Sequence, residues 1–223
     1  MNPFRGLKGW YAFEGNPDDS GPEKHAGVAV GMVYGVGKVG RCGVFDGLGA
    51  RVETDNLLLP ATKTLPFTIA AWVNPQDTGD YRTIASNTDM HNEFSYQFCL
   101  DNGAGTFGLY WDYTGEAWDG GLTTAATAPP NVWSYVAVTY AGNYPQVGMS
   151  LYLNGVSVPF AEDSGGVVGD VSGVYRATMI GTAFYWGTIC QPFKGSIDEL
   201  VFANRALSAQ EIYQLYIGGT PME

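Results

Sequence analysis

Apolar and polar residues alternate with a period of two along most of the chain, which is the pattern of β-strands. In FTIAAWV, residues 67–73, both alternating sets of side chains are largely apolar, so we expect a strand that is covered on both faces. WSYVAVTY, residues 133–140, has the same character and is expected at the centre of a sandwich. Further strands are predicted over residues 10–14, 43–45, 50–53, 81–86, 94–100, 106–111, 177–181 and 195–202.

Glycine and asparagine mark the turns between these strands. In MSLYLNGVSV, residues 149–158, the Asn154-Gly155 pair predicts a hairpin with a type I′ turn, because both residues tolerate a positive φ. The glycine-rich stretch GVAVGMVYGVGKVG, residues 27–40, lacks the strand-turn-helix context of a dinucleotide-binding loop. We therefore interpret residues 27–40 as a series of turns.

One short helix is predicted near the C-terminus, in SAQEIYQLY, residues 208–216. Ser208 can accept a hydrogen bond from the amide of Glu211, and the Glu211 side chain can bond back to Ser208. Apolar side chains then recur at helical spacing on one face. We expect this helix to pack on the sandwich.

Composition agrees with an all-β domain. Of 223 residues, 45% are hydrophobic, which is enough for a sizeable core, and 31 Gly with 12 Pro suit many short strands joined by tight turns. The chain shows no fixed-period repeat and no low-complexity linker. We predict a single domain over residues 1–223, folded as a two-sheet antiparallel jelly-roll sandwich with one short C-terminal helix.

Charge and cysteine content argue against some classes of partner and of site. The 22 acidic and 11 basic residues give a formal net charge of −11, and the basic residues are scattered, which argues against nucleic acid as a partner. Cys42, Cys99 and Cys190 are odd in number and widely spaced, so we expect free thiols. No segment reaches the roughly 20 apolar residues of a membrane span. No export signal is visible, which predicts cytoplasmic synthesis, or an extracellular location if a cleaved segment is missing.

Four segments resemble the laminin-G-like, or concanavalin-A-like, jelly-roll domain family, particularly its bacterial and phage members. The most specific is the last, in which a Gly-x-Ile-Asp-Glu strand precedes Asn-Arg-Ala-Leu-Ser and the short helix. The resemblance implies two antiparallel sheets packed face to face with the first and last strands adjacent. It implies no single function, because such domains serve as sugar binders, adhesion modules, enzyme appendages and virion proteins. The segments are GWYAFEGNPDDSGPEKHAG, LPFTIAAWVNP, NVWSYVAVTYAG with LYLNG, and FKGSIDELVFANRALSAQEIYQLY.

A structural calcium site is the first candidate for chemistry. Asp18, in the Asp18-Asp19-Ser20-Gly21 loop, and Asp198 match the positions of the family's metal-binding segments. Calcium takes several oxygen ligands, and two carboxylates with loop carbonyls could supply them. If Ile197 faces the core, Asp198 points to the other side of its strand. The alternative is that the loop aspartates form an Asx-type turn and Asp198 caps a loop amide.

An aromatic-rich stretch, YWDYTGEAWDGG, is the second candidate. Aromatic faces stack on sugar rings while neighbouring carboxylates accept hydrogen bonds from sugar hydroxyls, so a glycan site needs both residue types together. A second aromatic segment lies near residue 185. The alternative is that these rings only pack beneath a loop. The predicted ligand-binding residues are Trp111, Tyr113, Trp118, Asp119, Tyr185 and Trp186.

Catalysis is the main rival to binding. Laminarinase-type glycoside hydrolases share this sandwich and carry acids as E-x-D-x-E on one strand, which places a nucleophile and a proton donor on the same face. No such segment is present, and regular alternation would put Asp198 and Glu199 on opposite faces.

We therefore predict a non-catalytic binding or attachment module for glycan recognition or adhesion, with a glycan or a protein surface as its partner. The alternative is a bacteriophage virion protein, a capsid decoration or fibre component, which would contact other virion proteins and be a homo-oligomer. A glycoside hydrolase is the less favoured alternative.

Overall fold

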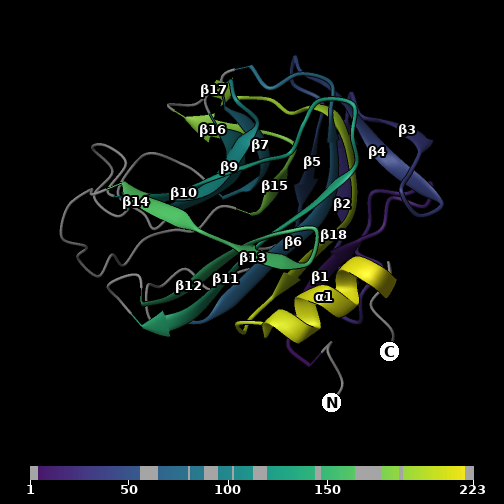
Figure 1. The fold of residues 1–223 in the computed structure, drawn as a ribbon. Helices are drawn as coiled ribbons and strands as arrows, with labels where there is room; N and C mark the ends of the chain where they lie inside the picture. Colours follow the sequence, from purple (N-terminus) through teal and green to yellow (C-terminus); the bar gives the residue numbers. More distant parts are fainter. Residues whose placement is uncertain are drawn as a thin grey trace.

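Two eight-stranded antiparallel sheets pack face to face, with a two-stranded hairpin and one helix outside them (Figure 1). The computed structural model describes residues 5–55, 65–79, 81–87, 95–101, 103–112, 120–143, 147–163, 177–185 and 188–218. The predicted all-β sandwich with one C-terminal helix is confirmed.

The first sheet contains both the first strand and the last. Strand β18 lies beside β6 on one side, and on its other side it pairs first with β4 and then with β1. The predicted adjacency of the two ends of the fold is therefore confirmed. In order across the sheet the strands are β13 (Val156–Val158), β12 (Val147–Leu153), β11 (Ser134–Asn143), β6 (Phe67–Pro75), β18 (Lys194–Ala203), β4 (Arg41–Asp46) and β3 (Val33–Val36), with β1 (Leu7–Tyr11) on β18.

The second sheet is built from strands that lie between those of the first sheet along the chain. The hairpin of β16 (Ala183–Tyr185) and β17 (Thr188–Cys190) follows β15. In order across the sheet the strands are β14 (Phe160–Asp163), β10 (Gly120–Thr127), β9 (Thr106–Asp112), β8 (Ser95–Asp101), β7 (Arg82–Ser86), β15 (Met179–Ile180), β5 (Arg51–Thr54) and β2 (Gly27–Val30).

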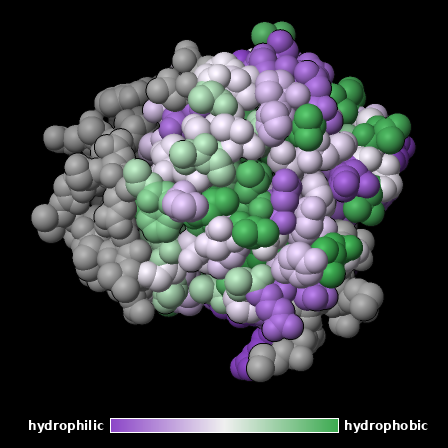
Figure 2. Space-filling view, viewed as in Figure 1, coloured by the Kyte–Doolittle hydropathy of each residue, from purple (hydrophilic) through white to green (hydrophobic). Residues whose placement is uncertain are grey.

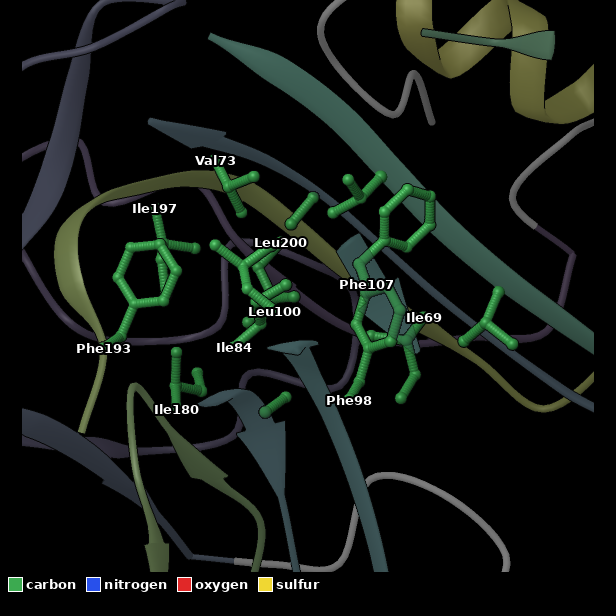
Figure 3. Packing of buried hydrophobic residues seen from close by; sticks show 14 of the residues in the cluster. Ile69, Val73, Ile84, Phe98, Leu100, Phe107, Ile180, Phe193, Ile197 and Leu200 are labelled. Atoms are coloured by element: carbon green, nitrogen blue, oxygen red, sulfur yellow. The ribbon is translucent and has the colours of Figure 1, made fainter. Parts of the chain in front are cut away.

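One large apolar core fills the space between the two sheets (Figure 3). It takes alternate residues from each strand, among them Ile69 of β6, Ile197 of β18, Phe98 of β8 and Phe107 of β9. Full burial of such side chains contributes about 1.5–3 kcal/mol each. Because successive side chains of a strand point to opposite faces, the residues between these core positions are directed out of the sandwich.

Helix α1 (Ala209–Gly218) covers the outer face of the first sheet. The Trp72 ring packs against Tyr135 and against Tyr216 of the helix, with centroid distances of 5.3 and 5.4 Å. Ile212 and Leu215 of the helix are buried in the same cluster, as the apolar face of the predicted helix requires. Both faces of β6 are therefore covered, as predicted.

Two predicted local features are confirmed. Asn154 and Gly155 both have positive φ, 50° and 78°, at the turn that joins β12 to β13. At the start of α1 the Ser208 amide donates to Glu211 Oε2 at 2.8 Å, and the Glu211 amide donates to Ser208 Oγ at 3.3 Å. The helix begins at Ala209 because this reciprocal cap satisfies amides that have no partner within the helix.

The interpretation of residues 27–40 as turns is wrong for most of that stretch. The structure forms β2 and β3 there, joined by Gly31 and Met32. Gly31 has a φ of 69°, so it turns the chain from the second sheet into the first. The glycines obscure the alternation of the valines between them, which is why the sequence pattern did not reveal these strands.

The capping contacts of α1 predict how stability depends on pH. Arg205 donates hydrogen bonds to both carboxylate oxygens of Glu211 and holds its pKa at about 2, below its ordinary value. A carboxyl whose pKa falls on folding stabilises the protein above its unfolded pKa, and this stabilisation is lost as the pH falls toward 2. We predict that Glu211→Gln lowers the free energy of unfolding by about 1 kcal/mol at pH 7 and by much less near pH 2, measured by urea denaturation. An equal loss at both pH values would contradict this account.

Candidate functional site

The outer face of the second sheet carries a row of polar side chains on its central strands. Phe98 and Leu100 of β8 and Leu109 of β9 point into the core, so the residues that alternate with them lie on the outer face. These outer residues include Gln97, Cys99 and Asp101 of β8, Tyr110 of β9 and Thr123 of β10.

A buried carboxylate lies at the centre of this row. Asp101 is only 9% exposed, and its Oδ2 accepts a hydrogen bond from the Tyr110 hydroxyl at 2.7 Å. Thr123 Oγ1 lies 3.3 Å from the same oxygen and 2.8 Å from the Tyr110 hydroxyl. Burial, together with the neighbouring Asp101, raises the pKa of Tyr110, so its hydroxyl stays protonated. Asp101 Oδ1 is buried and has no hydrogen-bond partner among the described residues.

The aromatic rings beside Asp101 are held in fixed positions. A Cβ on Gly121 would lie 2.6 Å from the Tyr110 ring, so the ring rests on the bare backbone of β10. The Tyr81 ring meets the Tyr110 ring edge-on, at 5.6 Å between centroids and 86° between planes. These contacts fix the hydroxyl of Tyr110, and with it the orientation of the Asp101 carboxylate.

The hairpin of β16 and β17 lies over another part of the same outer face. Ser86 Oγ of β7 donates to the carbonyl of Thr182, just before the hairpin. After the hairpin, the Gln191 carbonyl accepts the Thr83 amide, and its side chain accepts a hydrogen bond from Gln97. The hairpin is therefore attached to the polar side of β7 and β8.

The side chains of the predicted glycan residues lie outside the part of the chain that the structure describes. Trp111 is in β9, with its backbone opposite Gly120 of β10, and Tyr185 is in β16. Tyr113, Trp118 and Asp119 fall in the connection between β9 and β10, and Trp186 falls at the end of the hairpin; all four lie outside the described residues. The structure thus places only the backbones of Trp111, in the second sheet, and of Tyr185, in the hairpin, and the predicted ligand-binding role of all six residues stays a prediction.

Sequence reasoning missed Asp101 as a site residue. It lies just past the end of the strand predicted over 94–100, and nothing in its neighbours along the chain marks it. Its partners Tyr110 and Thr123 come from two other strands, so only strand pairing brings them together.

A second group of acids lies on the outer face of the first sheet. Asp198 and Glu199 are both buried, and the pairing of β18 with β6 shifts register between Asp198 and Val201. Glu199 has a φ of 50°, as one residue of this bulge. The expectation that the two acids lie on opposite faces is therefore wrong. Glu199 accepts a hydrogen bond from Trp10 Nε1 at 2.9 Å on the outer side of the sheet.

Burial raises the pKa of both carboxyls, to about 6 for Asp198 and about 8 for Glu199, and the charge of Asp198 raises that of Glu199 further. Asp198 Oδ2 accepts hydrogen bonds from the amides of Lys38 and Val39, at 2.8 and 2.9 Å. The Asp198 carboxylate thus accepts hydrogen bonds from loop amides, which is the alternative to calcium binding that the sequence offered. Asp198 Oδ1 is buried without a hydrogen-bond partner among the described residues, so it has the capacity to bind a cation.

Asp18 makes its contacts elsewhere. Its Oδ1 accepts the amide of Gly27 at 3.0 Å, and its own amide bonds to Asn16. Glu14 approaches this loop instead: it accepts the Arg41 amide at 3.0 Å, and its charge contributes to the raised pKa of Asp198. Within the described ranges, no group of three or more His, Cys, Asp and Glu side chains is placed to hold a metal ion. Calcium bound by Asp18 and Asp198 stays a prediction.

Comparison with known proteins assigns the family. The sequence profile of the concanavalin A-like lectin/glucanases superfamily matches residues 46–213, more than half of the chain. The chain belongs to this superfamily. A search of curated protein sequences finds no significant match.

Several solved structures share the concanavalin A-like fold at low sequence identity. Domain 4 of AbnA, a GH43 extracellular arabinanase from Geobacillus stearothermophilus solved with arabinotriose, has a TM-score of 0.72 and 19% identity over 94% of this chain and 98% of that one. The CBM40 domain of the Ruminococcus gnavus IT-sialidase, bound to α2,3 sialyllactose, has a TM-score of 0.54 and 20% identity over 69% of this chain and 84% of that one.

A third match is longer than this chain. The binding domain of Paraclostridial Mosquitocidal Protein 1 has a TM-score of 0.72 and 14% identity over 97% of this chain, which spans about half (53%) of that chain. This concanavalin A-like domain therefore resembles carbohydrate-binding and receptor-binding modules, although the superfamily also includes glucanases.

Two further predictions concern the whole chain. Cys42, Cys99 and Cys190 form no disulfide bond with one another, in agreement with the expectation from their number and spacing. In the part of the chain that the structure describes, no helix combines the length and the apolar character needed to cross a membrane.

The calcium prediction can be tested by thermal unfolding. If Asp198 Oδ1 binds calcium, the ion stabilises the folded state by about 2.7 kcal/mol at a hundredfold excess over its Kd, and a chelator lowers the Tm. Asp198→Asn should abolish the difference between calcium and chelator, and Asp18→Asn should abolish it only if Asp18 is a ligand. If the wild-type protein has the same Tm in calcium and in chelator, the calcium prediction is wrong.

Proposed function

We propose that this domain is a non-catalytic glycan-binding module that holds its ligand on the outer face of the second sheet. The observation that carries the proposal is the Asp101 carboxylate. One of its oxygens is held by Tyr110 and Thr123, and the other is buried with no hydrogen-bond partner among the described residues. A buried acceptor without a partner is costly, and a ligand hydroxyl that displaces the groups covering Oδ1 and donates to it would offset that cost.

Sugar hydroxyls fit this arrangement chemically. A carboxylate accepts strong hydrogen bonds from hydroxyl groups, and aromatic rings pack on the apolar faces of sugars. The Tyr81 ring packs against Tyr110, which donates a hydrogen bond to the carboxylate, and Trp111 belongs to β9, the strand that carries Tyr110. The arabinotriose and sialyllactose in two solved structures of this fold support a sugar as the ligand class.

The number of described acidic side chains on the outer face of the second sheet favours binding over hydrolysis. A retaining glycosidase needs two carboxyl groups about 5–5.5 Å apart, and an inverting enzyme needs two that are slightly further apart. Among the described outward side chains of β8, β9 and β10, Asp101 is the only carboxylate. Of the other buried acids among the described residues, Asp198 and Glu199 lie on the first sheet, near Trp10 and the loop that contains Lys38, and Asp19 accepts the amides of Trp10 and Gly21.

The first test is glycan binding by an Asp101 variant. A glycan array identifies a ligand, and calorimetry then compares the wild-type protein with Asp101→Asn. The variant keeps the shape of the side chain but loses the charged acceptor, so we expect affinity to fall at least about tenfold, since a hydrogen bond to a charged group contributes about 1.5–3 kcal/mol.

Glu53→Gln is the matched control, because Glu53 lies on β5 of the same sheet and pairs with Arg51 rather than with this network. The control variant should bind as the wild-type protein does. Equal affinity of Asp101→Asn and wild type for an array-positive glycan would refute the proposed site, and an array without any binding would refute the function.

A second test addresses the predicted aromatic contacts. Trp118→Ala removes a ring from the connection between β9 and β10, and we expect it to weaken binding of the same glycan by about 1–2 kcal/mol. Trp133→Ala changes a ring beside the helix-covered cluster of the first sheet and serves as the control. A loss of affinity in both variants alike would point to unfolding rather than to a lost contact, so circular dichroism accompanies each measurement.

A further inference from the structure

Lysine and arginine are absent from a long stretch of the chain that supplies one end of the second sheet. All 11 of these residues lie within positions 5–82 and 176–205. Residues 83–175 between them contain β14, β10, β9 and β8, the first four strands across the second sheet. This end of the sheet is therefore built from a segment that is acidic throughout. The acidic residues of the segment are Asp89, Glu93, Asp101, Asp112, Glu116, Asp119, Glu162, Asp163 and Asp170.

The positive charge of the chain is carried by other parts of the molecule. Lys38 and Arg41 belong to the β3–β4 hairpin, and Arg51 of β5 pairs with Glu53. Figure 2 shows strongly hydrophilic residues, mixed with apolar ones, on the side where Figure 1 places the β3–β4 hairpin. In the order of strands, β5 lies beyond β7 and β15 from β8.

The elements next to the polar outer face supply no counter-ion for Asp101. The hairpin of β16 and β17, residues 183–190, contains no charged residue. Arg82 begins β7, the strand beside β8, but its guanidinium donates hydrogen bonds to Asp77 and to the Pro192 carbonyl. Among the described residues, the lysine and arginine side chains form their ion pairs with acids other than Asp101.

The charge of Asp101 is therefore uncompensated within the described part of the chain. Tyr110 and Thr123 bind its Oδ2, but both donate from uncharged hydroxyl groups. Its Oδ1 is buried with no hydrogen-bond partner among the described residues. A buried carboxylate is costly unless an opposite charge pairs with it. A ligand that brings a positive charge would supply what the surrounding strands lack.

We infer that the glycan bound on this face contains an amino sugar, whose protonated amine displaces the groups covering Asp101 Oδ1 and donates to that oxygen. The inference rests on the proposed glycan-binding function and adds the chemical class of the sugar. Hydrogen bonds between an ammonium group and a carboxylate are charge-assisted and about twice as strong as neutral ones. The amine therefore contributes more here than a sugar hydroxyl would.

The same charge distribution disfavours acidic sugars. Uronic acids, sialic acids and sulfated sugars meet like charge at this end of the sheet, where residues 83–175 offer no lysine or arginine to bind them. In this respect the domain differs from the CBM40 domain that was solved with sialyllactose. The fold is shared, but the charge of the face selects a different class of sugar.

The first test compares amino sugars with their uncharged counterparts. The probe is a glycan array that carries each amino sugar polymer with its amine free and with its amine acetylated, together with acidic glycans. We expect the wild-type protein to bind a free-amine form, to bind its acetylated form about tenfold less tightly, and to leave acidic glycans unbound. Calorimetry measures both dissociation constants, with a chelator present so that no metal ion supplies the positive charge.

The same pair of glycans then shows whether Asp101 is responsible. In Asp101→Asn the preference for the free amine should fall from about tenfold to less than about threefold, because the charged acceptor is gone. Glu53→Gln is the matched control, since it removes the same charge from another strand of the sheet and should keep the preference. Polylysine reports attraction by net charge alone, so both variants should weaken its binding equally.

The outcomes separate this inference from the proposed function. Binding of neutral or acidic glycans without a preference for the free amine overturns the amino sugar but leaves glycan binding in place, and a blank array overturns both. An equal loss of preference in the two variants also overturns the inference, because the attraction is then general. Polylysine binding that depends on Asp101 alone would make a basic peptide the ligand instead. The wild-type comparison needs no variant, so it decides the inference even if circular dichroism shows that Asp101→Asn is misfolded.

Discussion

The burial of one face of each sheet against the other is the constraint on which the rest of this structure depends. Apolar side chains fill the space between the sheets, among them Ile69, Phe98, Phe107 and Leu200. Because successive side chains of a strand point to opposite faces, the residues that alternate with them face outward. The outward face of the first sheet is apolar enough to bind a helix, so it is closed. The outward face of the second sheet is polar, and Asp101 lies there with one incompletely bonded carboxylate oxygen, as Asp198 does beside the loop that contains Lys38 on the first sheet. The two outer faces thus differ because their outward alternate positions are mainly apolar in the first sheet and polar in the second.

Much of this architecture could be predicted from local patterns. β6 and β11 are apolar on both alternating sets, the Asn154-Gly155 turn has few alternatives, and the Ser208 and Glu211 cap is a short-range signal. Each of these features is decided by residues a few positions apart, and each agrees with the final fold. Agreement between local and global preferences is what makes such elements predictable.

The features that escaped prediction depend on more distant contacts. The valines of β2 and β3 are separated by glycines, so these strands are defined by their pairing with β5 and β4 rather than by their own sequence. The bulge in β18 inserts a residue that regular alternation does not anticipate, and it brings Glu199 to the side of Trp10. Asp101 acquires its role only when three strands place it beside Tyr110 and Thr123. Composition singles out the aromatic segments, but it gives no indication of the Asp101 carboxylate.

The order of strands in the second sheet has a further consequence. β10 and β2 lie near opposite ends of the sheet, with β9, β8, β7, β15 and β5 between them. The polar outer face of β10, β9 and β8 is therefore at the far end of the sheet from β2. Wherever two such domains are tethered together, the second attachment to a polysaccharide with repeated units becomes intramolecular, and weak individual contacts combine into avidity that can exceed a single site by about 10²–10⁴. The length and spacing of the polymer, rather than its monomer alone, would then decide what this protein holds.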